Sequence, residues 1–324
     1  MLQQLINENN YIQVEGLCET TIQLKVEGLN PAGSIKLKAA HALIADLECR
    51  GLITPGTRLI ESSSGNLGVA LAMVCAAKGY RFVCVIDPNI SAQNKRLIQT
   101  LGAEIMMVDT RDENGGYLHS RIRLIEQLVA QGIGYIWLNQ YQNPANPLGH
   151  YKTTATSIAQ KFPRVDYLFV GAGTTGTLMG CRNYFSEHYP DTKIIAVDAV
   201  GSVTFGLPGS PRYIPGLGTS RRPEIFEPSG IHAFVSITET HTIKMCRWLA
   251  QRHGLLFGGS TGTVLAGVQQ WAANIRPDDV VVAISPDMGE RYLETIYSDE
   301  WVSQRLDSTA LQPLFPVIDL PLSA

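Results

Sequence analysis

The chain has 324 residues, of which 45% are hydrophobic and 17% are charged, with a formal net charge of −3. This length is enough for two ordinary domains, and the composition excludes a disordered or fibrous chain. No basic stripe indicates nucleic acid binding, and the longest apolar run, residues 69–77, is too short to cross a bilayer.

Strand and helix patterns alternate along the chain, which predicts an α/β fold with largely parallel sheets. Short apolar runs predict strands, and longer periodic runs predict helices. The predicted strands cover residues 58–61, 81–86, 103–108, 135–138, 167–170, 194–197 and 280–285. The predicted helices cover residues 66–78, 92–101, 117–130, 153–161, 177–188 and 240–253.

Three connecting or terminal segments have a distinct composition. Residues 139–147 are rich in Asn and Pro, which favours a hinge between domains. Residues 201–222 are dense in Gly, Pro, Ser and Arg, which is typical of an ordered functional loop. The segment after Leu306 carries three prolines, so we expect it to be peripheral.

Cysteine usage and the first residues bear on the cellular compartment. The six cysteines form no Cys-x-x-Cys pair, and the first residues lack the basic and apolar pattern of a secretory signal. We therefore expect reduced thiols and a cytoplasmic protein.

The segment Asn30-Pro31-Ala32-Gly33-Ser34-Ile35-Lys36 places a lysine directly after a tight turn. Pro31 fixes one backbone angle, and Gly33 permits an unusual one. A lysine held in this way can form a Schiff base with a carbonyl group. For the segment taken alone, the alternative is a solvated lysine in a surface loop.

The loop Gly171-Ala172-Gly173-Thr174-Thr175-Gly176-Thr177 lies between a predicted strand and a predicted helix. Its glycines let backbone amides approach an anion, and the helix start adds partial positive charge, so the loop suits a phosphate. One alternative is a turn of small residues without a ligand. Another is the dinucleotide fingerprint G-x-G-x-x-G, with Asp198 as the acid that binds ribose.

A second turn between strand and helix reads Ser62-Ser63-Ser64-Gly65-Asn66-Leu67-Gly68. Its hydroxyls and amide suit a carboxylate, whereas the alternative is helix capping by Ser64. A third turn, Phe257-Gly258-Gly259-Ser260-Thr261-Gly262, precedes an apolar helix, and its alternative is tight helix packing. A lysine and two anion sites match what a pyridoxal phosphate enzyme acting on amino acids must hold.

Together these segments resemble the fold-type II pyridoxal phosphate enzymes of the cysteine synthase and cystathionine β-synthase family. The resemblance covers about residues 20–301 and implies a two-domain α/β fold, similar to the tryptophan synthase β subunit, with mostly parallel sheets flanked by helices. The smaller domain would span residues 37–145, and the larger would combine residues 1–36 and 146–305. Residues 306–324 would form a tail, and the family implies a homodimer.

The resemblance also implies a role for each matching residue. Lys36 would carry pyridoxal 5'-phosphate and act as general base, Asn66 would bind the cofactor's 3′-oxygen, and Ser260 would face its ring nitrogen. Its phosphate would be bound by Gly173, Thr174, Thr175, Gly176 and Thr177. The carboxylate of an amino-acid substrate would be bound by Ser63, Ser64 and Gln140. No metal is expected.

Within the family, the chain resembles members that join O-phospho-L-serine to L-glutamate by β-replacement, on the route to L-2,3-diaminopropionate and siderophores. The likeness rests on residues 60–68, 115–121, 139–141, 197–199, 218–221 and 297–299. Arg121 and Arg221 would meet the phosphate or the glutamate carboxylates, with Tyr141 and Ser220 beside them. For Arg121 the alternative is a solvated arginine on a helix face, and for Arg221 it is a salt bridge at the rim of the site.

The chain also differs from the family pattern. Leu37 and Lys38 stand where the family usually has Asp-Arg, Gly173 stands where glutamate-using members have serine, and residues 143–147 look like cysteine synthases. A cysteine synthase, using sulfide with O-acetylserine or O-phosphoserine, is therefore the same-fold alternative. From other classes, the alternatives are a dinucleotide-dependent oxidoreductase and a relative without catalytic activity.

Overall fold

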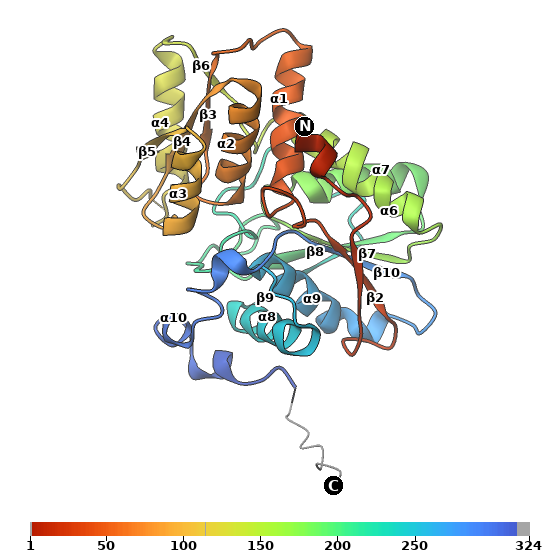
Figure 1. Ribbon diagram of the computed structural model, residues 1–324. Helices are drawn as coiled ribbons and strands as arrows, with labels where there is room; N and C mark the ends of the chain where they lie inside the picture. Colours follow the sequence, from red (N-terminus) through yellow and green to blue (C-terminus); the bar gives the residue numbers. More distant parts are fainter. Residues whose placement is uncertain (1, 114, 316–324) are drawn as a thin grey trace.

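The computed structural model describes residues 2–113 and 115–315 of the chain, which form two sheets (Figure 1). The larger sheet has the strand order β1-β2-β10-β7-β8-β9, and the smaller sheet has the order β5-β4-β3-β6. Every neighbouring pair is parallel except β1 and β2. The predicted α/β fold with largely parallel sheets is confirmed.

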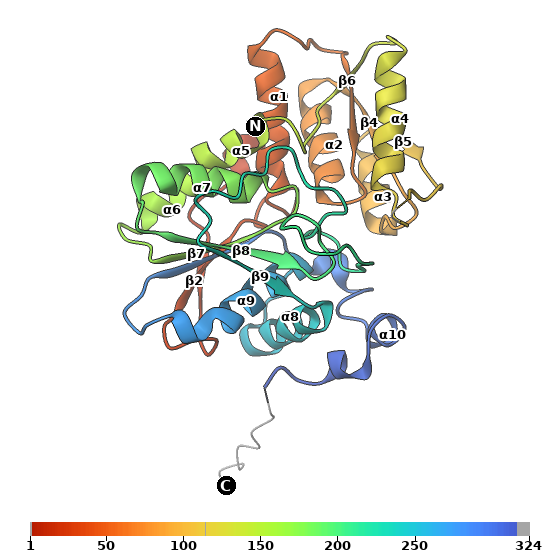
Figure 2. The same cartoon turned by 180° about the vertical axis from the view of Figure 1, so that it is seen from behind.

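The larger sheet draws its strands from both ends of the chain. They are β1 (Tyr11–Val14), β2 (Ile22–Val26), β7 (Tyr167–Gly171), β8 (Lys193–Ala199), β9 (Ala233–Ile237) and β10 (Val281–Ser285). Helices cover both faces in the two opposite views (Figures 1 and 2). One face carries α8 (Glu239–His253) and α9 (Gly259–Trp271), and the other carries α6 (Thr156–Lys161) and α7 (Gly176–His188). Helix α5 (Ala145–His150) contacts both α7 and the first helix, α1 (Lys36–Cys49).

The smaller sheet comes from one continuous stretch of chain. Its strands are β3 (Arg58–Ser62), β4 (Arg81–Ile86), β5 (Glu104–Met107) and β6 (Tyr135–Trp137). Helices α1 (Lys36–Cys49), α2 (Asn66–Lys78) and α3 (Ala92–Thr100) pack on one face, and α4 (Leu118–Ala130) packs on the other. Because both faces are buried, the inner strand β4 is a continuous apolar run from Phe82 to Ile86 rather than an alternating one.

The structure corrects the predicted elements at several places. Sequence patterns missed β1, β2, α1, β9 and α10 (Asp299–Ser303). The predicted loop at residues 139–147 ends early, since α5 begins at Ala145. Pro147 fits the first turn of this helix because amides there have no acceptor within the helix. The division into domains of residues 37–145 and the remainder stays a prediction.

The end of the described chain packs against α8. A short 3₁₀ turn (Ser308–Leu311) buries Ala310 in an apolar cluster with Ile243 of α8, after α10 (Asp299–Ser303). Part of the segment predicted to be peripheral therefore contributes to a core, and residues 316–324 lie outside the described residues. Within the described residues, no helix has both the length and the apolar character that a membrane span requires.

Two buried lysines and two glutamates form an ion network at the start of α1. Lys38 Nζ lies 2.7 Å from Glu27 Oε2 and 2.6 Å from Glu8 Oε2, and it donates to Thr154 Oγ1 at 3.2 Å. Lys25 Nζ lies 3.3 Å from Glu8 Oε2 and 3.6 Å from Glu27 Oε1. The four formal charges cancel, so the buried lysines are compensated.

This network accounts for the unusual residues that follow Lys36. Leu37 is fully buried in the apolar core of α1 and α2, where a charged residue would be unpaired. Lys38 points to the other side and pairs with Glu27. The start of α1 is thus ordered without the Asp-Arg pair that is usual in the resembling family.

Replacing Lys38 by Met should cost about 3 kcal/mol or more of unfolding free energy, because it leaves Glu27 buried beside a more distant lysine. Urea denaturation at neutral pH measures this loss. Lys78→Met is the matched control, since its 2.6 Å pair with Glu48 is partly exposed and should contribute about 1 kcal/mol or less. Equal losses in the two variants would contradict the prediction.

Candidate active site

Lys36 is the first residue of α1 and follows a turn in which the Asn30 side chain makes three hydrogen bonds. Asn30 Nδ2 donates to the carbonyls of Glu27 (2.8 Å) and Ser34 (2.9 Å), and its Oδ1 accepts from the Ala32 amide (2.9 Å). Gly33 has a φ of 65°, which a residue with a side chain adopts only with strain. The Asn-Pro-x-Gly pattern therefore builds the turn that aims Lys36.

Lys36 is half-buried, and its amine makes no hydrogen bond to another described residue. Burial lowers its pKa to about 8, while the carboxylates of Asp287 and Glu61 oppose this shift. A larger fraction of neutral amine than in an ordinary lysine is thus present near neutral pH. A neutral amine is what a nucleophile or a general base requires.

The glycine-threonine loop, residues 173–177, joins β7 to α7 as predicted. Thr175 has a φ of 67°, which is strained for a β-branched residue, and its buried Oγ1 has no partner within the described residues. The amides of Thr174 and Thr175 also lack acceptors there. A Cβ at Gly173 would lie 2.7 Å from the Gly216 carbonyl, and one at Gly176 would collide with Asn146. The loop is shaped to receive an anion.

A buried histidine ties this loop to the ion network at α1. His150 Nε2 lies 3.3 Å from Thr177 Oγ1, and Nδ1 lies 3.3 Å from Thr154 Oγ1, which accepts from Lys38. Burial lowers the pKa of His150 to about 3, so the ring is neutral at physiological pH. His150 therefore supports the loop by hydrogen bonds rather than by charge.

Ser260 and Asn66 come from two different helix starts. Ser260 is buried on the first turn of α9, and its hydroxyl has no partner among the described residues. Gly216, at a φ of 115°, approaches it so closely that a Cβ would collide with Ser260 Oγ. Asn66 begins α2 and donates from Nδ2 to Asp287 Oδ2 at 2.8 Å.

The N-cap of α2 is Gly65, which has no side chain, so the alternative of capping by Ser64 is wrong, and Ser63 bonds to the amides of this turn instead. Its hydroxyl oxygen accepts from the amides of Gly65 (3.3 Å) and Gly68 (3.0 Å). A serine oxygen has two acceptor positions and one hydrogen, so these two contacts leave the hydrogen available to a carboxylate.

Ser64 is engaged differently, because its only hydrogen is donated to Asp87 Oδ2 at 2.9 Å. Its oxygen accepts from the Asp87 amide (2.9 Å) and from Arg121 Nη1 (3.0 Å), and Arg121 Nη1 lies 3.3 Å from Asp87 Oδ2. Substrate binding by Ser64 stays a prediction, and it requires this hydrogen to be released.

Glu61 was missed as a site residue, although a charged residue inside an apolar strand was a signal. Its carboxylate is buried and accepts from the amides of Ser62 (2.7 Å) and Gln140 (3.1 Å) and from Trp137 Nε1 (3.3 Å). Burial raises its pKa to about 7. Gln140 Nε2 in turn donates to the Ser62 carbonyl at 3.1 Å. Glu61 thereby joins the serine-rich turn to the loop that carries Gln140.

Tyr141 lies within electrostatic reach of three arginines. Burial raises the pKa of its hydroxyl, and the charges of Arg121, Arg221 and Arg212 oppose that shift. Arg212, which was not predicted, donates to Ser220 Oγ at 3.3 Å. Arg221 is ion-paired with Glu224, and it also faces α4 across a cavity of about 190 Å³.

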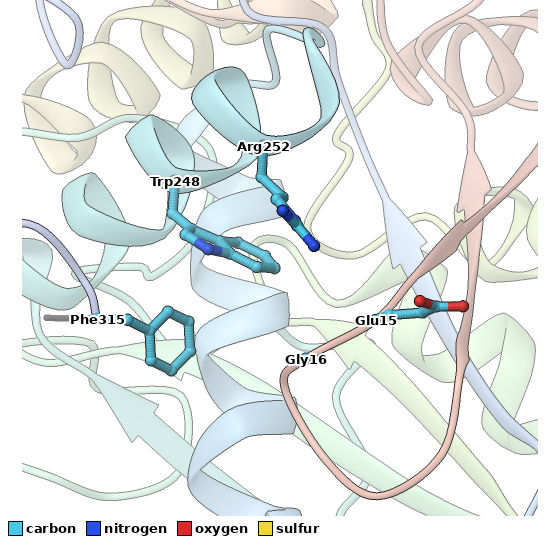
Figure 3. A pocket seen from close by; sticks show the side chains of 5 residues that line it. All are labelled: Glu15, Gly16, Trp248, Arg252 and Phe315. Carbon is cyan, nitrogen blue, oxygen red and sulfur yellow. The ribbon is translucent and has the colours of Figure 1, made fainter. Parts of the chain in front are cut away.

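Two other features lie apart from these groups. The Asp198 carboxylate accepts from the Ala199 amide at 2.8 Å and is buried, so it is directed at its own backbone rather than at a ribose. A cavity of about 330 Å³ is lined by Glu15, Gly16, Trp248, Arg252 and Phe315 (Figure 3). Gly16 precedes β2 whereas the Lys36 turn follows it, so this cavity is at the opposite end of that strand.

The chemistry of these groups fits pyridoxal phosphate. Thr174, Thr175 and the following glycine offer free amides and an unpartnered hydroxyl for a phosphate. Lys36 offers an amine of lowered pKa for the aldehyde, and Ser260 offers a neutral hydroxyl for a ring nitrogen. No carboxylate among the described residues is hydrogen-bonded to Ser260.

Comparisons with known proteins agree with this chemistry. Residues 3–287 match the family described as "Pyridoxal-phosphate dependent enzyme". The chain is 42% identical over 287 residues to the N-(2-amino-2-carboxyethyl)-L-glutamate synthase of Ralstonia nicotianae (strain ATCC BAA-1114 / GMI1000), covering 88% of this chain and 85% of the relative.

Solved structures share the fold. The chain superposes on O-ureido-L-serine synthase with a TM-score of 0.84 and 32% identity, covering 93% of this chain and 98% of the other. It superposes on the O-acetylserine-dependent cystathionine β-synthase of Helicobacter pylori with a TM-score of 0.85 and 28% identity, covering 92% and 98%. The dinucleotide alternative is therefore set aside, and the chain belongs to the family of pyridoxal-phosphate-dependent enzymes, as a cysteine synthase-like member.

Proposed function

We propose that the enzyme catalyses β-replacement on O-phospho-L-serine with L-glutamate. The product would be N-(2-amino-2-carboxyethyl)-L-glutamate, a precursor of L-2,3-diaminopropionate. The named relative from Ralstonia nicotianae supports this product. The support from the site is the group of arginines around Tyr141, because a phosphate and a dicarboxylate need cationic partners that sulfide does not need.

The main support for the proposal is the burial of Arg121 together with a hydrogen-bond donor that lacks a partner. Its side chain is only 12% exposed, and its buried Nε has no partner within the described residues. A guanidinium N–H that is buried without an acceptor costs free energy. This cost is removed when a ligand oxygen accepts from it. Ser64 and Asp87 hold the guanidinium from one side, which fixes its direction beside the serine-rich turn.

Each group of the site has a role in this reaction. Bound pyridoxal phosphate supplies an electron-withdrawing ring that acidifies the α-hydrogen of the amino acid. Lys36 removes that hydrogen as general base and later returns it at the same carbon. Ser63 donates its free hydrogen to the substrate carboxylate, and Gln140, positioned by Glu61, completes this contact. The phosphate leaves from the β-carbon toward Arg121, and the glutamate amine attacks that carbon.

Cysteine synthase activity is the second candidate. Gly173 favours it, because a Cβ there would lie 2.7 Å from the Gly216 carbonyl, which leaves too little room for the serine that the family resemblance implies for glutamate-using members. Sulfide is small and needs no extra cationic groups. The two candidates differ only in substrates, so kinetics separates them.

Steady-state assays should give kcat/KM at least about 100-fold higher with O-phospho-L-serine and L-glutamate than with O-acetyl-L-serine and sulfide. The expected reason is that the arginine group recognises anions on both substrates of the first pair. Product formation is followed by mass spectrometry and phosphate release. Faster turnover with sulfide would replace the proposed function by the second candidate.

Arg121→Gln should lower kcat/KM for O-phospho-L-serine by about 10- to 100-fold, the value of one charge-assisted hydrogen bond. The loss for O-acetyl-L-serine should be much smaller, because acetate leaves with less charge. Arg123→Gln is the matched control on α4, since Arg123 is 57% exposed and pairs with Glu113. A folding defect would lower kcat/KM for both substrates by the same factor, so equal losses would refute the role of Arg121.

The apoenzyme should take up pyridoxal phosphate faster as pH rises, and the rate should level off above about pH 8. Below its pKa, Lys36 is an ammonium that cannot attack an aldehyde, and burial sets that pKa to about 8. The growth of visible absorbance measures uptake, and Lys36→Ala should show none. A rate that keeps rising to about pH 10.4, as for an ordinary lysine, would contradict the lowered pKa.

A further inference from the structure

The segment that follows β10 contacts three of the four elements that carry the proposed cofactor residues, the exception being the glycine-threonine loop. The Asp287 carbonyl accepts from the Gly258 amide at 3.0 Å, beside the start of α9. The Pro286 carbonyl accepts from the Ile35 amide at 2.7 Å, next to Lys36. The side chains of the same segment reach the start of α2. This segment, residues 286–292, is therefore a common support for Lys36, Asn66 and Ser260.

The amide of Asn66 has one orientation that satisfies its neighbours. Its Nδ2 donates to Asp287 Oδ2 at 2.8 Å, and its Oδ1 accepts from Arg291 Nη1 at 3.0 Å. A rotation that exchanged nitrogen and oxygen would set a carbonyl against a carboxylate and an amino group against a guanidinium. Asp287 on one side and Arg291 on the other thus determine the orientation of the Asn66 amide.

Arg291 also reaches the turn before Lys36. Its Nη2 donates to the Ala32 carbonyl at 2.8 Å, and the guanidinium lies 3.2 Å from where a Cβ of Gly33 would be. One planar group therefore holds Asn66 and the lysine turn at a fixed separation. The absence of a side chain at Gly33 makes room for it, which is a second reason for glycine at this position.

Asp287 is itself held in place from several directions. It is 2% exposed, its Oδ2 accepts from Tyr292 OH as well as from Asn66, and its Oδ1 has no partner among the described residues. The Tyr292 hydroxyl also lies 3.3 Å from Asn66 Nδ2 and takes the second hydrogen of that nitrogen. This longer bond is the one that a ligand oxygen would replace.

We propose that Asp287 and Arg291 are positioning residues, which hold Asn66 with its amide nitrogen as donor toward the cofactor and keep the Lys36 turn in register with it. The inference rests on the role proposed for Asn66, and it is independent of which nucleophile the enzyme uses. Neither residue needs to touch the substrate for this role.

The test measures the visible absorbance of the bound cofactor and the affinity of the apoenzyme for pyridoxal phosphate. Asn66→Ala should weaken this affinity and shift the absorbance maximum. Asp287→Leu and Arg291→Met should shift the absorbance maximum in the same direction and weaken the affinity for pyridoxal phosphate by about tenfold or more. Asp287→Asn should retain most of the affinity, because its carbonyl oxygen still accepts from Asn66.

Glu290→Gln is the control, since Glu290 is exposed and adjacent to Arg291 but makes no hydrogen bond to the site. It should leave both readouts unchanged. If Asp287→Leu fails to fold, Arg291→Met decides the question. A shift in Asn66→Ala without one in Arg291→Met would overturn the inference and leave the proposed reaction standing. No shift in Asn66→Ala would overturn the role of Asn66 and the inference with it.

Discussion

The parallel arrangement of the strands is the constraint on which the site depends. In a parallel sheet, all turns from strand to helix lie along the same edge, so ligands bind at the carboxyl ends of the strands. In the larger sheet, this edge carries the Lys36 turn after β2 and the glycine-threonine loop after β7. In the smaller sheet, it carries the serine-rich turn after β3 and the Gln140 loop after β6. A hydrogen bond between Asn66 and Asp287 joins the two edges.

Local motifs at these edges could be predicted from sequence, because each depends on a few adjacent residues. The glycines of residues 173–177 and the Asn-Pro-x-Gly turn before Lys36 are needed for backbone shape, and that need is visible in the residue types. Most buried strands were predicted for the same reason. By contrast, α5 was hidden by Pro144 and Pro147, which usually mark loops but are tolerated at a helix start.

Contacts between distant parts of the chain could not be predicted in this way. Lys38 reads as a surface lysine on a helix, and only the fold brings it to Glu27 and Glu8. Asp287 is separated from Asn66 by 221 residues, so no spacing rule connects them. The hydrogen bonding of Ser63 and Ser64 is a similar case, because two adjacent serines have the same composition but different partners. Such assignments depend on which hydrogen-bond donors and acceptors stay unpaired in the folded protein.

The order of strands in the larger sheet has a consequence for synthesis on the ribosome. Strand β10 lies between β2 and β7, so β2 pairs with nothing but β1 until residues 281–285 have emerged. The smaller sheet, by contrast, is complete once Trp137 has been made, and domains generally fold as units in the order of synthesis. The nascent chain therefore carries Lys36 long before it has the strand that pairs with β2 next to the turn before this lysine. A ribosome-bound chain that ends before Val281 therefore lacks the strand that pairs with both β2 and β7, so the two parts of the larger sheet cannot yet be joined through it.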